Sequence, residues 1–340
     1  MANGTPALDT LASPMRDIGL VGLPFSGKST LFTALTRAGA AGGRANQAVV
    51  PVPDPRLAVL TELERSRKTV AAQVRFVDVP GGTGAQGLAA MREVDALGVV
   101  LRAFGPEADP ARDLSEVLAE LLLADLAVVE SALENARRRA KGRSGAVPEI
   151  DTLERAHAAL SEERALREVG FDEDARAHLR GLAPLTLKPW IPVANFEEGA
   201  ALPDGLPEGT VAVFASIEAE TAGMDEEEAR ELLAEFGVTE PGLESVIAAC
   251  YRALDLITFL TTGEDETRAW EVRRGATAPE AAGAIHTDLQ RGFIRAEVVS
   301  YEDLVAAGSW NAAKTKGQLR VEGKDYVVRE GDILHVRFNV

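Results

Sequence analysis

The chain is poor in cysteine and in long apolar runs, and each shortage excludes a class of protein. A single cysteine among 340 residues, Cys250, cannot form a disulfide within the chain and fits a reducing cytoplasm. Cys250 lies in an apolar run, so we expect its side chain to be buried as a small hydrophobic group. No apolar stretch reaches the ~18 residues of a membrane span, and we expect no membrane partner. Residues 1–15 lack the basic start and long apolar middle of a signal peptide, and we interpret them as a flexible leader.

Basic residues and histidines are also scarce. The chain has 36 lysine and arginine residues against 53 acidic ones, which gives a formal net charge of −17. This excess argues against wholesale coating of nucleic acid, and we expect no DNA specificity. The four histidines show no spacing typical of metal ligands. We therefore expect no metal other than a nucleotide-bound Mg²⁺.

The most informative segment that is present is a complete phosphate-binding loop at 22–29, Gly-Leu-Pro-Phe-Ser-Gly-Lys-Ser. The apolar run at 18–21 predicts a buried strand before it, and 30–36 is apolar at helical spacing after it. Strand, loop and helix together would surround an anion with backbone N–H groups. Lys28 would reach the β- and γ-phosphates, and the Ser29 hydroxyl would ligate Mg²⁺. The loop residues predicted to contact the nucleotide are Gly22, Leu23, Pro24, Phe25, Ser26, Gly27, Lys28, Ser29 and Thr30.

Two further motifs fit a nucleotide site. Asp78-Val-Pro-Gly81 follows a strand predicted over 74–78; Asp78 would hold Mg²⁺ through water, and the Gly81 N–H would sense the γ-phosphate. Asn195-Phe-Glu-Glu198 ends another predicted strand, where GTPases carry Asn-Lys-x-Asp. The missing lysine and the glutamate in the fourth place disfavour guanine. Each motif could also be an ordinary turn after a strand.

The pattern along the chain predicts an α/β protein with a helical insertion. Alternating strand and helix patterns from 18 to 104 indicate a parallel sheet. Leu- and Ala-rich helical periodicity from 114 to 182, broken at 142–145, indicates a helical hairpin. After residue 256 the chain is strand-rich, and a hairpin is predicted between 324–328 and 333–338. The remaining predicted elements are strands at 96–101, 190–194 and 211–214, and helices at 225–236 and 243–254.

The motifs resemble those of the YchF/Obg-like ATPase family, a branch of the translation-factor GTPases that prefers ATP. The resemblance spans nearly the whole chain after residue 16. The matching stretches are Gly22-Leu-Pro-x-x-Gly-Lys-Ser-Thr30, Val50-Pro-Val-Pro-Asp-Pro-Arg-Leu57, Val77-Asp-Val79, Val193-Ala-Asn-x-x-Glu198, Ile217-Glu-Ala-Glu220, Thr277-Ala-Pro-Glu-Ala-Ala-Gly283, Ile285-His-Thr-Asp288, Arg291-Gly-Phe-Ile-Arg-Ala-Glu297 and Leu319-Arg-Val-Glu-Gly-Lys-Asp-Tyr-Val327.

The resemblance implies a domain order and a set of ligands. It implies a P-loop G domain over 16–111 and 184–254, an inserted helical domain over 112–183, and a C-terminal TGS domain with a β-grasp fold over 255–340. It also implies ATP and Mg²⁺ as ligands and association with ribosomes. By position, Asn195 and Glu198 would lie at the adenine, with Ala215 in the loop beside it.

The chain departs from that family in segments that support hydrolysis. The family's switch I carries a threonine that completes the Mg²⁺ shell, whereas 38–49 contain neither Thr nor Ser. The loop after Gly81 is short and lacks the family's candidate catalytic histidine. Gln86 is the one nearby side chain that could orient a water, and a flexible polar loop residue is the alternative reading of it. Phe25-Ser26 also replaces the family's usual Asn-Val. We predict nucleotide binding with slow or partner-dependent hydrolysis.

One basic segment interrupts the acidic composition. Residues 137–143, Arg-Arg-Arg-Ala-Lys-Gly-Arg, end the first helix of the predicted hairpin. Cations are favoured at a helix C-terminus, but the same segment could contact RNA phosphates. A similar surface could be formed in the terminal domain by Arg273, Arg274, Arg291 and Arg295.

The leading hypothesis is an ATP-responsive switch protein, expected to be a monomer, that binds ribosomes or ribosomal RNA. One alternative is a nucleotide-binding module without turnover, which the missing switch threonine supports. Others are a GTP-preferring GTPase and a P-loop small-molecule kinase. The kinase is disfavoured because the Asn-x-x-Glu motif and the TGS-like tail have no role in that chemistry.

Overall fold

The computed structural model describes residues 15–38, 47–79, 82–141, 147–197, 205–221, 224–236 and 242–339. Contacts divide the chain into two compact units. The P-loop unit consists of Arg16–Val50 and Arg75–Ala253, and the C-terminal unit contains Pro51–Val74 and the chain from Leu254 onward. This division differs from the predicted boundaries, which placed 51–74 inside the G domain.

A six-stranded sheet in the order β2-β4-β1-β5-β6-β7 forms the centre of the P-loop unit. Its pairs β1–β5, β5–β6 and β6–β7 are parallel, and the central strands are almost wholly buried apolar runs, as a sheet covered on both faces requires. The predicted strands are confirmed. The strands of this sheet are β1 (Arg16–Val21), β2 (Gln47–Pro51), β4 (Gln73–Asp78), β5 (Ala96–Ala103), β6 (Trp190–Phe196) and β7 (Val211–Val213).

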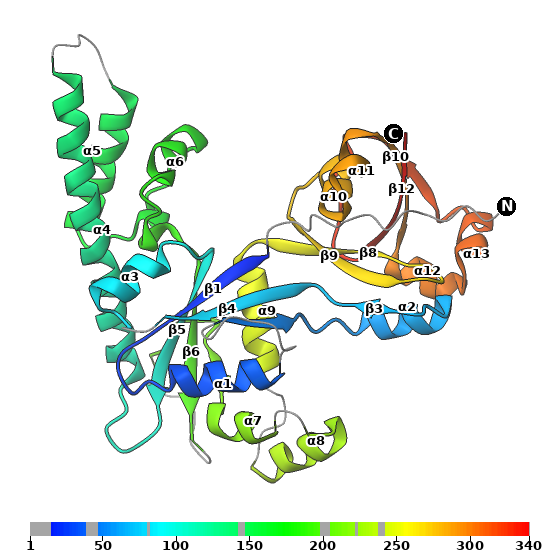
Figure 1. Ribbon diagram of the computed structural model, residues 1–340, viewed down its shortest axis with the longest axis horizontal. Helices are drawn as coiled ribbons and strands as arrows, with labels where there is room; N and C mark the ends of the chain where they lie inside the picture. Colours follow the sequence, from blue (N-terminus) through cyan, green and yellow to red (C-terminus); the bar gives the residue numbers. More distant parts are fainter. Residues whose placement is uncertain are drawn as a thin grey trace. The chain divides into compact units, whose positions relative to one another are not determined.

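Helices pack on this sheet (Figure 1), with α9 against β6 and β7. The helices predicted at 225–236 and 243–254 are confirmed as α8 and α9. Cys250 on α9 is fully buried, as expected, and burial raises the pKa of its thiol to about 12. The helices of the P-loop unit outside the insertion are α1 (Lys28–Ala38), α3 (Ala85–Met91), α7 (Ala215–Thr221), α8 (Glu226–Glu235) and α9 (Gly242–Ala253).

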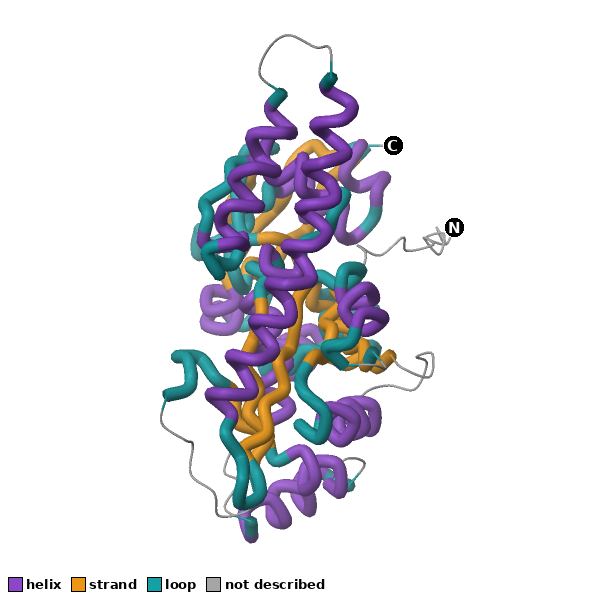
Figure 2. Tube along the Cα trace, turned by 90° about the vertical axis from the view of Figure 1, so that its left-hand side faces the viewer, coloured by secondary structure: helices purple, strands orange, loops and turns teal. Residues whose placement is uncertain are grey.

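The helical insertion is built on α4 (Pro110–Ala140) and α5 (Pro148–Ser161), which run side by side (Figure 2). The Asp109 side chain caps α4 by accepting a hydrogen bond from the Arg112 N–H at 3.0 Å. The apolar stripe of α4 packs on α5 and on η2 (Leu185–Leu187), while η1 (Leu166–Glu168) and α6 (Glu173–Arg180) pack on α5 in the same apolar cluster. The predicted pair of helices is confirmed, while the predicted break at 142–145 lies outside the described residues.

The C-terminal unit contains a second six-stranded sheet, in the order β11-β10-β12-β8-β9-β3. The edge strand β3 pairs in parallel with β9, so segment 51–74 supplies part of this sheet. Helix α10 covers one face through a buried alanine-rich side. The elements are α2 (Arg56–Glu64), β3 (Thr69–Val70), β8 (Leu256–Thr261), β9 (Thr267–Arg273), α10 (Ala278–Ile285), α11 (Thr287–Arg291), β10 (Phe293–Ser300), α12 (Tyr301–Ala307), α13 (Trp310–Thr315), β11 (Arg320–Glu322) and β12 (Asp332–Phe338).

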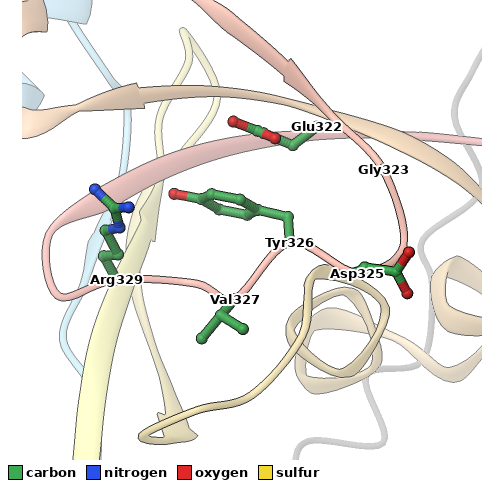
Figure 3. A pocket seen from close by; sticks show the side chains of 6 residues that line it. All are labelled: Glu322, Gly323, Asp325, Tyr326, Val327 and Arg329. Carbon is green, nitrogen blue, oxygen red and sulfur yellow. The ribbon is translucent and has the colours of Figure 1, made fainter.

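The predicted hairpin between 324–328 and 333–338 is wrong. β12 pairs with β10 and β8 instead, and 324–328 form only an isolated bridge between Val327 and Thr277. The buried Asp332 carboxylate explains the difference, because it accepts hydrogen bonds from the Tyr326 hydroxyl at 2.7 Å and the Arg329 N–H at 2.8 Å. These bonds hold the segment as a loop, which lines a surface pocket (Figure 3).

In the described part of the chain, no helix is both long enough and apolar enough to cross a bilayer.

Candidate nucleotide site

The phosphate-binding loop lies between β1 and α1, where the sequence predicts it. β1 ends at Val21 and α1 begins at Lys28. Two glycines make the loop possible. A β-carbon on Gly22 would lie 2.3 Å from the Val100 carbonyl oxygen, and Gly27 has φ +87°, a conformation that favours glycine. A larger residue at Gly22 would therefore collide with the backbone of β5, and one at Gly27 would collide with the Asn195 amide.

Lys28 is held over this loop by backbone oxygens. Its Nζ donates to the carbonyls of Gly22 at 3.0 Å and Leu23 at 3.3 Å. Burial lowers the pKa of Lys28, and the negative charge of Asp78 opposes that shift. The ammonium group is therefore partly desolvated, positioned and available for an anion, as the sequence predicts for a phosphate contact.

The second motif lies beside the first. Asp78 ends β4, and Gly82 follows the loop with φ +54°. A β-carbon on Gly82 would lie 3.4 Å from the Gly22 oxygen and 3.8 Å from Lys28 Nζ, so the chain after Asp78 returns to the phosphate-binding loop. Ser29 is exposed on the first turn of α1. The Ser29 hydroxyl and the Asp78 carboxylate are the oxygen ligands that Mg²⁺ prefers, whereas Gly81 lies outside the described residues.

Asn195 connects the phosphate-binding loop to the loop that follows β7. Its Nδ2 donates to the Ser26 carbonyl at 3.3 Å, and its Oδ1 accepts from the Ala215 N–H at 3.2 Å. The side chain is buried, and a β-carbon on Gly27 would lie 2.1 Å from Nδ2. The structure thus brings together Asn195 and Ala215, two of the residues predicted at the base. Glu198, the third, lies outside the described residues.

Glu218 is a site residue that the motif reasoning left without a role. It lies on α7 within Ile217-Glu-Ala-Glu220 and is 2% exposed. Its carboxylate accepts from the Phe214 N–H at 3.1 Å and from the Leu243 N–H, on the first turn of α9, at 2.7 Å. Burial raises the pKa of Glu218, and these backbone N–H groups act in the opposite direction. Glu218 therefore fixes the residue next to Ala215.

Gln86, the catalytic candidate, lies on the first turn of α3 and is exposed. Among the described residues, no group of three or more His, Cys, Asp or Glu side chains is arranged to hold a metal ion by itself. A catalytic role for Gln86 stays a prediction.

The basic segment at the end of α4 is partly neutralised. Arg137 pairs with Glu154 at 2.8 Å and Arg139 with Glu149 at 2.7 Å, both across to α5. These pairs are exposed, so each contributes little to stability and leaves the cation accessible. Gly142 and Arg143 lie outside the described residues.

Comparison with known proteins identifies the family. A family model described as "50S ribosome-binding GTPase" (MMR_HSR1) matches residues 17–131, and YchF-GTPase_C, "Protein of unknown function (DUF933)", matches residues 256–339. The "Ribosome-binding ATPase YchF" of Haemophilus ducreyi is 41% identical, over 95% of this chain and 99% of that protein. The chain belongs to the YchF family. The YchF proteins of Bacillus subtilis and Escherichia coli O157:H7 are each 40% identical, over 95% of this chain and 99% of the relative.

The fold agrees with membership of the YchF family. A solved YchF GTPase of Schizosaccharomyces pombe superposes with a TM-score of 0.84 at 31% identity, covering 95% of this chain and 97% of that one. The predicted family and the predicted fold class, a P-loop domain followed by a C-terminal sheet domain, are confirmed. As a P-loop NTPase family member, the protein binds nucleotide.

Proposed function

We propose that this YchF-family protein is an ATP-binding switch that works in the cytoplasm with ribosomes or ribosomal RNA. The observation that carries the proposal is the convergence of Lys28, Asp78 and Asn195 on one loop, which supplies a cation, a carboxylate and a link to the base-side loop. The ribosomal partner is supported by relatives named as ribosome-binding ATPases. We also propose that the chain comprises a G domain, a helical insertion and a β-grasp TGS domain and acts as a monomer.

Ser29 and Asp78 are the proposed Mg²⁺ residues. A bound Mg²⁺ would neutralise charge on the phosphates. Lys28 would bind the β- and γ-phosphates, and the exposed first turn of α1 would leave the Ser29 hydroxyl free to face the ion. Asn195, Glu198 and Ala215 are the proposed adenine-side residues, and Gly81 the proposed γ-phosphate contact.

Slow or partner-stimulated hydrolysis is the turnover we propose, because positions 38–49 contain no hydroxyl residue and the Gln86 side chain is exposed. The same observations favour a second candidate, a nucleotide-binding module without turnover. Single-turnover kinetics with excess protein separates the two from a fast enzyme. Phosphate release at about 1 s⁻¹ or faster without a partner would contradict both candidates.

Nucleotide affinity tests the binding proposal. The dissociation constants of ATP, ADP, GTP and GDP would be measured by titration calorimetry with Mg²⁺ present. We expect ATP to bind more tightly than GTP, and Lys28→Ala to weaken ATP binding about 30-fold or more, since a charge-assisted contact is lost. Lys314→Ala, an exposed lysine on α13, is the matched control. Tighter GTP binding would overturn the adenine assignment and favour the GTPase alternative.

Co-sedimentation with ribosomes tests the partner. A variant with Arg137, Arg138, Arg139 and Lys141 changed to alanine should sediment less with ribosomes, and the loss should diminish at high salt, where phosphate contacts are weak for both proteins. Lys314→Ala/Lys316→Ala, at two exposed lysines outside both basic surfaces named above, is the control with charge removed elsewhere. Equal sedimentation of all three proteins would show that the basic residues at the C-terminal end of α4 do not contact the ribosome.

A further inference from the structure

Phe25 occupies an unfavourable position at the top of the phosphate-binding loop. Its backbone has φ +65°, in the left-handed region that disfavours residues carrying a β-carbon. Its side chain is 86% exposed, the highest exposure among the large hydrophobic residues of the described chain. The residue therefore combines backbone strain with an aromatic ring in water, and neither feature helps the chain to fold.

The loop geometry imposes this conformation and keeps the ring on the outside. Ser26, the next residue, is 1% exposed, and its carbonyl is held by the Asn195 amide. On the N-terminal side of Phe25, the carbonyls of Gly22 and Leu23 accept hydrogen bonds from the Lys28 ammonium group. Because the loop is fixed at both flanks, the Phe25 ring cannot retreat into the core without breaking these contacts.

The residues that follow Phe25 in the loop are those that the proposed nucleotide would contact. Lys28 is partly desolvated, and Ser29 and Thr30 are exposed on the first turn of α1. Strained residues are typically retained at ligand sites, where the cost is offset by function. A ring that covers a ligand gains free energy because its apolar surface is removed from water. It also keeps water away from the phosphates, and their attraction to Lys28 is stronger where water is excluded.

We propose that the Phe25 ring closes over the nucleotide bound at this loop and slows its release. This inference rests on the nucleotide binding proposed above and adds a determinant of the lifetime of the bound state. In a protein with slow hydrolysis, the release rate sets how long the switch stays in one state, so a single aromatic side chain governs the duration of the signal.

Release kinetics tests the proposal. Fluorescent N-methylanthraniloyl ADP would be bound with Mg²⁺ and chased with excess ADP in a stopped-flow instrument. Phe25→Ala and Phe25→Gly should both release it on the order of tenfold faster than the parent protein, with association rates changed much less. Glycine also relieves the backbone strain, so agreement between the two variants assigns the effect to the ring. Leu123→Ala, at an exposed leucine on α4, should release at the parent rate.

A second measurement reports the ring directly. Phe25→Trp places a fluorophore at this position, and adding Mg–ADP should shift its emission to the blue, whereas the parent protein with its three native tryptophans should show a smaller change. Parent-like release by Phe25→Ala, or faster release by Phe25→Gly alone, would overturn the proposal. If the parent protein binds no nucleotide at all, the proposed function fails first, and that result is visible in the equilibrium titration before any release experiment.

Discussion

Two buried polar side chains govern the loops around the proposed base site. Asn195 joins the Ser26 carbonyl to the Ala215 N–H, and Glu218 joins the Phe214 N–H to the start of α9. Consecutive N–H groups of one short loop are therefore bound by side chains from two different elements. Buried hydrogen bonds of this kind fix loop geometry strongly, because breaking one leaves an unsatisfied polar group away from water.

The pKa of Glu218 gives stability a pH dependence. Since burial raises its folded-state pKa above the ordinary value of 4.5, the folded state binds the proton more tightly than the unfolded state. The stability that this group contributes is complete below pH 4.5 and is lost as pH rises through the folded-state pKa. Urea unfolding from pH 4 to 7 should therefore show the parent protein losing stability relative to Glu218→Gln. A difference that grows in favour of the parent with rising pH would mean that the backbone N–H groups outweigh burial.

At the scale of elements, one buried carboxylate joins α4 to the η2 turn and to the end of α3. Asp125 is fully buried and accepts from the N–H groups of Leu185 at 3.0 Å and Thr186 at 2.7 Å. Its Oδ1 also lies 2.7 Å from Arg92 NH1, beyond the end of α3. The long helix, the η2 turn and the end of α3 thus meet at a single side chain.

Removing that carboxylate should destabilise the P-loop unit. Asp125→Ala leaves the Arg92 guanidinium without its counter-charge and two buried N–H groups without an acceptor, and we expect a loss of about 3 kcal/mol in the free energy of unfolding. Glu130→Ala, on an exposed position of the same helix, should stay within about 0.5 kcal/mol of the parent. Urea denaturation followed by circular dichroism measures both, and equal stabilities would show that the network contributes nothing.

These elements also mark what the sequence could predict. The strands at 18–21 and 96–101 are continuous apolar runs and α4 has a regular apolar stripe, so local pattern was sufficient. Asp125 is the polar residue on that stripe and is buried, yet its partners lie 33 to 61 residues away in the sequence, beyond any helical periodicity. The prediction of a strand at 324–328 was wrong for a related reason. The residues alternate as in a strand, but hydrogen bonds to the Asp332 carboxylate hold them in a loop. In the site, motifs located Lys28 and Asn195 but not the backbone atoms that they bind.

At the scale of the whole molecule, segment 51–74 connects the two units, because the main chain passes from one to the other at each of its ends. It leaves the P-loop unit after β2 and returns through β4, which leads directly to Asp78. Within the C-terminal unit it is fixed by β3–β9 pairing and by Ser66, whose hydroxyl donates to the Gly263 carbonyl at 2.7 Å. The chain that carries the second phosphate motif is therefore continuous with a strand of the other unit's sheet.

Arg56 links this segment to the rest of the C-terminal unit through Glu330. It forms two hydrogen bonds to Asp54, at 2.8 and 2.7 Å, and lies 2.6 Å from the carboxylate of Glu330, which in turn accepts from the Thr258 N–H at 2.8 Å. Hydrogen bonds to the carboxylates of Asp54 and Glu330 raise the pKa of Arg56, so the guanidinium stays charged.

Arg56→Ala should loosen the C-terminal unit selectively. Loss of charged hydrogen bonds costs about 2 kcal/mol, so hydrogen–deuterium exchange should quicken in 56–64 and in β8 while β1 and β5 keep their protection. Arg274→Ala removes an exposed pair with Asp255 and should change exchange little. Equal loss of protection in β5 would mean that the two units unfold as one, and unchanged protection everywhere would mean that pairing between β3 and β9 alone holds the segment.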